Sequence, residues 1–304
     1  MPQLSAAEYA RGVAYGLGAV LIWGGWMVLS RLGMKSTLTP WDMVALRVGL
    51  GGLFLLPVLL HKGLARDRLG TSGLLMIMLG GGAPLVLLVN VGLLYAPAAH
   101  AGALFPGVMP LMVAVLAAIF LGEAFTRSKA IGFTLVIAGV LGILWVAGGA
   151  LDWRQNLGHA CFLGAALLWA FYVIALRRAQ LDGLHAAAIA AVASLVVYIP
   201  IYVLFLDPRL LQAPVGELSL HAFVQGVLTA VVSLVLHGRS VAILGASSAS
   251  ALSALSPALT ALMAIPVLGE YPPPPEWVAI ALVSAGVWFI SGGPAKRPAA
   301  PPPA

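Results

Sequence analysis

The sequence is short of charge: only 9% of its 304 residues are Asp, Glu, Lys or Arg, whereas 61% are hydrophobic. A soluble domain carries about 25% charged residues, so a soluble fold of this composition would expose a largely apolar surface. The composition therefore predicts that lipid covers much of the protein and that the bilayer is its main partner.

The sequence also lacks the usual signatures of catalysis and cofactor binding. Its one cysteine, Cys161, excludes an internal disulfide and a cysteine-based zinc cluster. No two of the six histidines have the spacing of a helical metal pair, and no glycine-rich phosphate loop precedes a lysine. We therefore expect no enzyme activity, no metal and no cofactor.

Nucleic acid is not an expected partner either, although the net charge is +6. The basic residues are scattered between apolar runs, which is the pattern that membrane topology produces.

Apolar runs long enough to cross a hydrocarbon core of about 30 Å occupy most of the chain. We predict an all-α membrane protein with ten transmembrane helices. The ten expected spans are 12–30, 41–60, 71–94, 98–121, 130–148, 156–176, 185–206, 220–237, 246–268 and 277–293.

The distribution of Lys and Arg predicts the orientation. With the N-terminus inside, eleven basic residues fall on inner segments and three or four on outer ones. We therefore expect a multi-pass protein of the inner membrane with both termini in the cytoplasm. Residues 1–11 form the N-terminal segment, and the Pro/Ala-rich tail 294–304 is predicted to be disordered.

The two halves of the chain share a pattern at a nearly constant offset. Pro110 corresponds to Pro257, and Leu-Gly-Glu at 121–123 returns at 268–270, in each case 147 positions later. Further matches join 18–23 to 164–169, Arg31 to Arg177, and 135–140 to 282–287.

These matches divide the chain into two repeats, 12–149 and 150–293, with five spans each. An odd number of spans makes the second repeat enter from the opposite side of the membrane, so the repeats are inverted. Inverted repeats around a central site are typical of secondary transporters.

This layout resembles the drug/metabolite transporter superfamily and, within it, the EamA family of exporters. The resemblance rests on Gly-Ala-x-Leu-x-Trp in the first span of each half and on Pro…Leu-Gly-Glu in the fourth. It covers about residues 12–293 and is similar in layout to the aromatic amino-acid exporters of that family. It implies a basket of helices around a central cavity, with the fifth and tenth spans at the periphery.

Aromatic residues near the middle of spans one and six are candidates for the wall of such a cavity. Trp23, Trp26, Trp169 and Tyr172 could stack on apolar side chains or hold cations, although apolar filling is an equal alternative. Asn90 in span three is a buried amide that needs partners, either another helix or a substrate.

Arg47 is the only charge well inside a span. Two interpretations remain open: it snorkels or pairs with Asp42, or it recognises a substrate carboxylate. His100 begins span four, either as an interfacial residue or as a proton site. No acid lies at mid-membrane, which favours facilitated diffusion over coupling to protons.

Three prolines are candidate hinges. Pro110 and Pro257 are expected to break backbone hydrogen bonds in mid-helix, and Pro106 adds a second break in span four. Ser253 replaces Pro106 in the second repeat, so the two kinks need not be equal. The serines of span nine, Ser253 among them, either pack closely or face a polar pathway.

Together these features predict an exporter of small metabolites, most simply amino acids, that works as a monomer by alternating access. An exporter of lipophilic or cationic drugs, driven by protons, is the alternative. Sugar nucleotides fit less well, because two phosphates would need several buried cations and only Arg47 is available.

Overall fold

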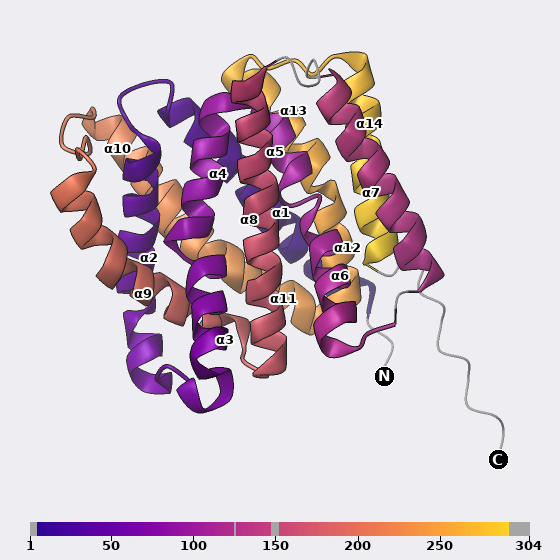
Figure 1. The fold of residues 1–304 in the computed structure, drawn as a ribbon, viewed down its shortest axis with the longest axis horizontal. Coiled ribbons are helices and arrows are strands. Elements are labelled where there is room, and N and C mark those ends of the chain that lie inside the picture. The colour runs from indigo at the N-terminus through magenta and orange to yellow at the C-terminus, as the bar shows by residue number, and fades with distance from the viewer. Residues whose placement is uncertain (1–4, 125, 147–151, 292–304) are drawn as a thin grey trace.

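The computed structural model describes residues 5–124, 126–146 and 152–291, and these are helical with no strand among them (Figure 1). The predicted all-α membrane architecture is confirmed. In the described ranges, nine helical runs are long and apolar enough to span a membrane, and a shorter apolar helix provides the tenth. The predicted tail at 294–304 lies outside these residues. The spans made of one continuous helix are α1 (Ala6–Gly33), α2 (Pro40–Lys62), α7 (Arg127–Val146), α8 (Trp153–Arg178), α9 (Gly183–Phe205) and α14 (Pro274–Ile290).

Local sequence signals set several of the helix starts. Ser5 and Glu8 form a reciprocal capping box at the start of α1, which therefore begins six residues before the predicted span. Thr39 and Asp42 form the same motif at the start of α2, and Pro40 occupies the first turn, where a missing N–H costs nothing.

The other four spans are interrupted near their middles. Span three breaks at Gly82, whose extended backbone separates two helices, and span four breaks at residues 105–108. Span eight contains a π-helical segment, and span nine contains one short 3-10 turn. The pieces are α3 (Arg66–Gly81), α4 (Ala83–Tyr95), α5 (Ala98–Leu104), α6 (Met109–Leu121), α10 (Val215–Ala222), η2 (Phe223–Val232), α11 (Ser233–Leu244), α12 (Ala246–Leu252), η3 (Ser253–Leu255) and α13 (Ser256–Leu268).

The hinge prolines lie elsewhere in their helices than the sequence suggested. Pro110 and Pro257 occupy the first turns of α6 and α13, so they begin half-helices instead of breaking continuous ones. Pro106 lies in the break itself, and Ser253 begins the equivalent break, so both repeats are interrupted although only one has the proline. Among the described helices, Pro57, Pro200 and Pro266 lie in the interiors of α2, α9 and α13.

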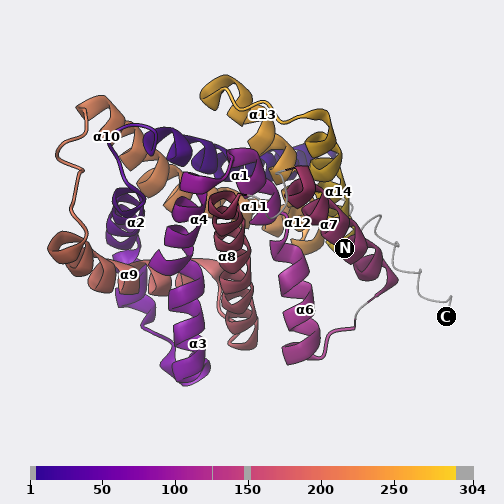
Figure 2. The same ribbon diagram turned by 45° about the horizontal axis from the view of Figure 1, so that its top comes forward.

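The packing of the helices follows the repeat. If each span of the first half is exchanged with its counterpart in the second, several of the main helix contacts are reproduced. Two contacts, α2 with α9 and α7 with α14, each join a span to its own counterpart. The contact of α1 with α11 corresponds to that of α8 with α4, and the contact of α1 with α13 corresponds to that of α8 with α6. In both ribbon views α7 and α14 lie at one edge and α2 and α9 at the other (Figures 1 and 2).

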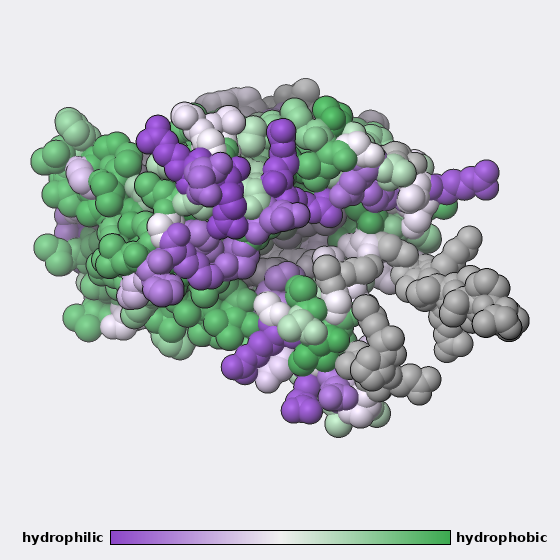
Figure 3. Space-filling view, turned by 90° about the horizontal axis from the view of Figure 1, so that it is seen from below, coloured by the Kyte–Doolittle hydropathy of each residue, from purple (hydrophilic) through white to green (hydrophobic). Residues whose placement is uncertain are grey.

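The bundle has one strongly basic end, toward which α14 runs and at which α3 begins (Figure 1). The helix ends gathered there carry Lys and Arg, and hydrophilic residues extend across this face in Figure 3. We call it the basic end, and the other the opposite end. The basic residues at these helix ends are Lys62, Arg66, Arg68, Arg127, Lys129, Arg177 and Arg178.

Large apolar side chains are exposed on the flanks of the bundle. Trp145 is 84% exposed, Phe205 76% and Ile119 66%. A soluble monomer rarely exposes apolar patches on this scale, whereas lipid tails cover them without cost. The protein is therefore a multi-pass membrane protein.

Candidate functional site

A central cavity lies where the interrupted spans meet. It is partly open to solvent. Both repeats contribute to its wall, including the breaks at Gly82 and in η2. The lining residues are Trp23, Trp26, Met27, Arg47, Val48, Gly51, Leu55, Gly81, Gly82, Leu85, Val86, Phe105, Pro106, Met109, Trp169, Tyr172, Ala187, Ala191, Thr229, Ala230, Ser233 and Leu234.

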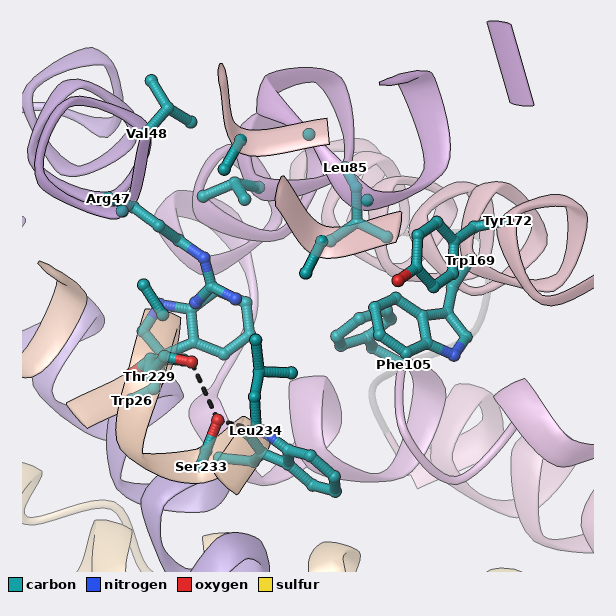
Figure 4. A pocket seen from close by; sticks show the side chains of 18 of the residues that line it. Trp26, Arg47, Val48, Leu85, Phe105, Trp169, Tyr172, Thr229, Ser233 and Leu234 are labelled. Carbon is teal, nitrogen blue, oxygen red and sulfur yellow. Dashed lines mark hydrogen bonds between the residues drawn. The ribbon is translucent and has the colours of Figure 1, made fainter. Parts of the chain in front are cut away.

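One side of the cavity is an aromatic wall. The rings of Trp169 and Tyr172 lie 4.9 Å apart between centroids, one helical turn apart on α8. Phe105, from the break in span four, lies 6.4 Å from Trp26 between ring centroids, and the Tyr172 hydroxyl points into the cavity (Figure 4). Gly80 and Gly81 let α3 approach α8 here, because a side chain at Gly80 would collide with the backbone oxygen of Leu168 at 2.1 Å. This wall offers flat, polarisable surface to an apolar group or a cation.

Arg47 lies on the other side of the cavity, with Trp26 beside it (Figure 4). Its guanidinium carbon is 4.3 Å from the centroid of the Trp26 ring. Its Nη1 atom is buried and has no hydrogen-bond partner, and in the described part of the chain no carboxylate forms an ion pair with it. A partly buried guanidinium whose buried Nη1 has no partner is suited to a ligand carboxylate.

The alternative pairing of Arg47 with Asp42 is not what the structure shows. The Asp42 carboxylate accepts hydrogen bonds from the backbone N–H and hydroxyl of Thr39, from the Tyr202 hydroxyl and from the Arg209 backbone N–H. Four donors already surround this carboxylate, so it stabilises the start of α2 and leaves Arg47 without a carboxylate.

Two hydroxyls and an indole complete the polar part of the cavity. Ser233 donates to the Thr229 carbonyl at 2.8 Å, and Thr229 donates to the Val224 carbonyl at 2.7 Å. The Trp23 indole N–H donates to the Ser233 hydroxyl at 3.1 Å. Both hydroxyl protons are thus used within span eight, and Trp23 is held against the second repeat.

Of the predicted site residues, Trp23, Trp26, Trp169, Tyr172, Arg47 and Pro106 line this cavity. The others lie outside its lining. Asn90 is fully buried and donates to the Val86 carbonyl of its own helix at 2.9 Å, and its side-chain oxygen has no partner. The remaining predicted residues outside the lining are Ser253, Pro110, Pro257 and His100.

His100 belongs to a separate buried cluster at the opposite end. Its Nδ1 lies 2.9 Å from Nε2 of His159, and its Nε2 lies 3.2 Å from the Glu276 carboxylate. All three side chains are buried. No sequence pattern joins His100 to His159, which is 59 positions away.

Several cavity residues were not anticipated. Phe105, Thr229 and Ser233 lie at or beside interruptions of spans four and eight; Pro106 and Pro110 indicated a break in span four, and no proline indicated the one in span eight. Within the described ranges no group of three His, Cys, Asp or Glu residues could hold a metal ion, and Cys161 is a buried free thiol.

The fold and the cavity together define a polytopic membrane protein with two inverted five-span repeats around a central cavity. The profile of the EamA-like transporter family matches the chain twice, over residues 10–145 and 156–292. The chain therefore belongs to the EamA-like transporter family, and the resemblance noted in its sequence is confirmed.

Individual relatives agree with this assignment. A protein of Streptantibioticus cattleyicolor named as a probable terminal-alkyne amino-acid exporter is 32% identical over 206 residues, which are 67% of this chain and 67% of that one. The uncharacterized transporter YyaM of Bacillus subtilis is 27% identical over 239 residues, 75% of this chain and 77% of its own. A solved crystal structure superposes with a TM-score of 0.61 at 22% identity over 92% of this chain and 96% of that one, which bears on the fold alone.

Proposed function

We propose that this transporter exports amino acids by alternating access, binding the substrate carboxylate at Arg47. The observation that carries the proposal is the unpaired Nη1 atom of Arg47 in a cavity that no acidic residue lines, within the described part of the chain. A cation in the membrane interior costs about 2.5–3.5 kcal/mol or more, a cost usually tolerated only for function. A carboxylate offers a guanidinium two parallel hydrogen bonds.

The other groups of an amino acid also find partners in this cavity. The ammonium group can lie over the Trp169 and Tyr172 rings, where a desolvated cation–π contact contributes up to about 2 kcal/mol. The apolar lining, including Met27, Leu85 and Phe105, suits an uncharged side chain. A zwitterion satisfies both walls at once, whereas a cationic drug would be repelled by Arg47.

The names of the relatives support the same substrate class. The Streptantibioticus protein is named as an exporter of an amino acid, and its matched region is two thirds of each chain. That name belongs to the other protein. For this chain it supports export of amino acids as a class, and it does not indicate which side chain the substrate carries.

The proposed direction follows from the charge on the basic end. Because Lys and Arg concentrate in cytoplasmic segments, the basic end is assigned to the cytoplasm and both termini with it. The membrane is then the inner membrane, a monomer contains the whole cavity, and net flux is outward when substrate accumulates inside.

The driving force is proposed to be the substrate gradient alone. No Asp, Glu or His is among the residues that line the cavity in the described part of the chain. Uptake into liposomes is therefore expected to be the same with and without a pH step across the membrane. A large dependence on the pH step would reject facilitated diffusion and favour proton coupling.

The binding experiment compares ligands that differ in one group. Neutral amino acids, their methyl esters and the corresponding amines are titrated against the purified protein, with thermal stabilisation as the readout. Stabilisation by the amino acids and little by the esters or amines supports the proposal. Equal stabilisation by all three, or stabilisation by lipophilic cations only, contradicts it and favours the drug-exporter alternative.

A further inference from the structure

Two ion pairs related by the repeat lie at opposite ends of the bundle. Arg31 at the end of α1 forms an ion pair with Glu270, which follows α13. Arg177 at the end of α8 binds Glu123, which follows α6, at 3.0 Å. Each member of one pair corresponds in the repeat to a member of the other. The same arginine–glutamate contact therefore occurs once at each end.

The pair at the opposite end is bound to a further segment of the chain. Arg31 donates through Nη1 to the backbone oxygens of Leu93 and Ala96, and the Ala96 contact is 2.8 Å long. Glu270 accepts from the backbone N–H of Ala98 at 2.9 Å. The pair thus ties α1 and α13 to the segment that joins spans three and four.

The pair at the basic end makes no such connection in the described part of the chain. Adding 147 to positions 93, 96 and 98 gives Ser240, Ile243 and Gly245, and no hydrogen bond joins them to Arg177 or Glu123. The Gly245 N–H bonds within its own span instead, to Val241 at 2.9 Å.

Exposure shows the same difference between the ends. The side chains of Arg177 and Glu123 are 44% and 35% exposed, whereas those of Arg31 and Glu270 are 17% and 16% exposed. The ion pair at the basic end exists, but it is open to solvent. Glu123 also pairs with Lys129 of α7 at 3.3 Å, but among the described residues neither Arg177 nor Glu123 binds the segment that joins spans eight and nine.

Helix packing differs between the ends in the same sense. At the opposite end α5 packs closely on α13, and every residue of α5 is buried. Their repeat counterparts at the basic end, α12 and α6, do not pack together to a comparable extent among the described residues. Ser248 and Ser250 of α12 are exposed there. The structure is therefore closed at the opposite end and open at the basic end.

We propose that the two ion pairs are alternating latches, and that each closes its end by binding a segment that joins two other spans. That segment lies between spans three and four at the opposite end and between spans eight and nine at the basic end. The proposal rests on alternating access as the mode of transport. In the state captured here the Arg31–Glu270 latch is engaged and the Arg177–Glu123 latch is released. When the cavity opens to the opposite end, Arg177 and Glu123 bind the backbone around residues 240–245.

The test measures the conformation directly, so it does not depend on the substrate. Ala99 packs against Ala261 of α13 and is 1% exposed. An Ala99→Cys reporter, made in a Cys161→Ala background, is therefore protected while the opposite end is closed. The rate of its labelling by a water-soluble maleimide in nanodiscs, where both ends are accessible, reports opening of that end.

Three variants are compared in this background. Glu270→Gln removes the charge of the engaged latch, and Ala98→Pro removes the N–H that donates to Glu270 while leaving both charges in place. Proline is tolerated there, because residue 98 begins α5 and needs no intrahelical donor. Glu123→Gln is the matched control at the basic end. Melting temperatures confirm that each variant is folded.

We expect Glu270→Gln to raise the labelling rate about tenfold, within the usual range of coupling between conformational states. Ala98→Pro is expected to raise it less, and Glu123→Gln not at all. The latch is refuted if labelling of the folded Glu270→Gln variant does not rise, or if all three variants raise it equally. An inactive protein that still shows this pattern would count against the proposed substrate and not against the latch.

Discussion

Replacing Arg47 with glutamine separates recognition from stability. If the guanidinium binds the substrate carboxylate, the variant loses charge-assisted hydrogen bonds that together contribute about 3 kcal/mol. A loss of that size weakens binding by roughly 100-fold. We therefore expect the apparent KM for a neutral amino acid to rise by about that factor, whereas the KM for the matching amine, if it is transported at all, changes little.

The same substitution should not destabilise the protein. The partly buried guanidinium costs about 2.5–3.5 kcal/mol in the membrane. Its contact with the Trp26 ring at 4.3 Å returns about 0.5–2 kcal/mol of this. The expected result is an unchanged or higher melting temperature together with weaker transport, which is the opposite of what loss of a structural ion pair would produce.

Two further variants calibrate the measurement, which is initial-rate counterflow in proteoliposomes. Arg47→Lys keeps the charge but loses the planar fork, so an intermediate KM is expected. Arg239→Gln removes an exposed cation that lies 5.6 Å from the Tyr15 ring, outside the cavity lining, and should leave KM unchanged. An Arg47→Gln variant with normal KM, or one that fails to fold, would refute the carboxylate-binding role.

Three other substitutions test the cavity, the packing and the breaks. Trp169→Ala should raise the KM for amino acids with large apolar side chains by about tenfold, since it removes one ring of the aromatic wall, and should affect alanine less; an equal effect on both would argue against a side-chain contact. Gly286→Val should destabilise the protein by about 1–3 kcal/mol without altering KM. A side chain at this position would lie 2.7 Å from the Gly132 backbone oxygen in the peripheral α7–α14 pair. Thermal melting measures the effect, and an unchanged melting temperature would contradict this close packing. Pro257→Ala should leave the yield of folded protein unchanged, because the proline occupies the first turn of α13. It should slow transport, because the helix can then extend into the break. A normal transport rate would show that Pro257 has no hinge role.

The architecture was predictable because the membrane leaves few choices. Each apolar run of about 20 residues must satisfy its backbone within itself, so helical spans can be identified from hydropathy. The repeat offset at Pro110 and Pro257 then predicted the inverted halves. The breaks were less predictable. Span nine is interrupted at Ser253 although no proline lies in the break, because packing between the repeats also determines where a helix is interrupted.

The partners of Arg47 could not be predicted from the sequence. Asp42, five positions earlier, was the obvious partner, yet its carboxylate caps α2 through Thr39. The Thr-x-x-Asp spacing is the signature of a capping box and could have excluded that pairing. Contacts between distant segments, such as that of Trp23 with Ser233, have no signature in a single sequence.

The central claim is that this chain alone carries amino acids through a cavity that faces each side of the membrane in turn. Trans-stimulation tests it most directly: proteoliposomes containing only this protein are preloaded with unlabelled amino acid, and entry of labelled amino acid is followed. Saturable entry that is accelerated several-fold by the internal substrate is the predicted result. Entry that is absent for every amino acid, or that rises linearly with concentration and ignores the internal substrate, would contradict the claim.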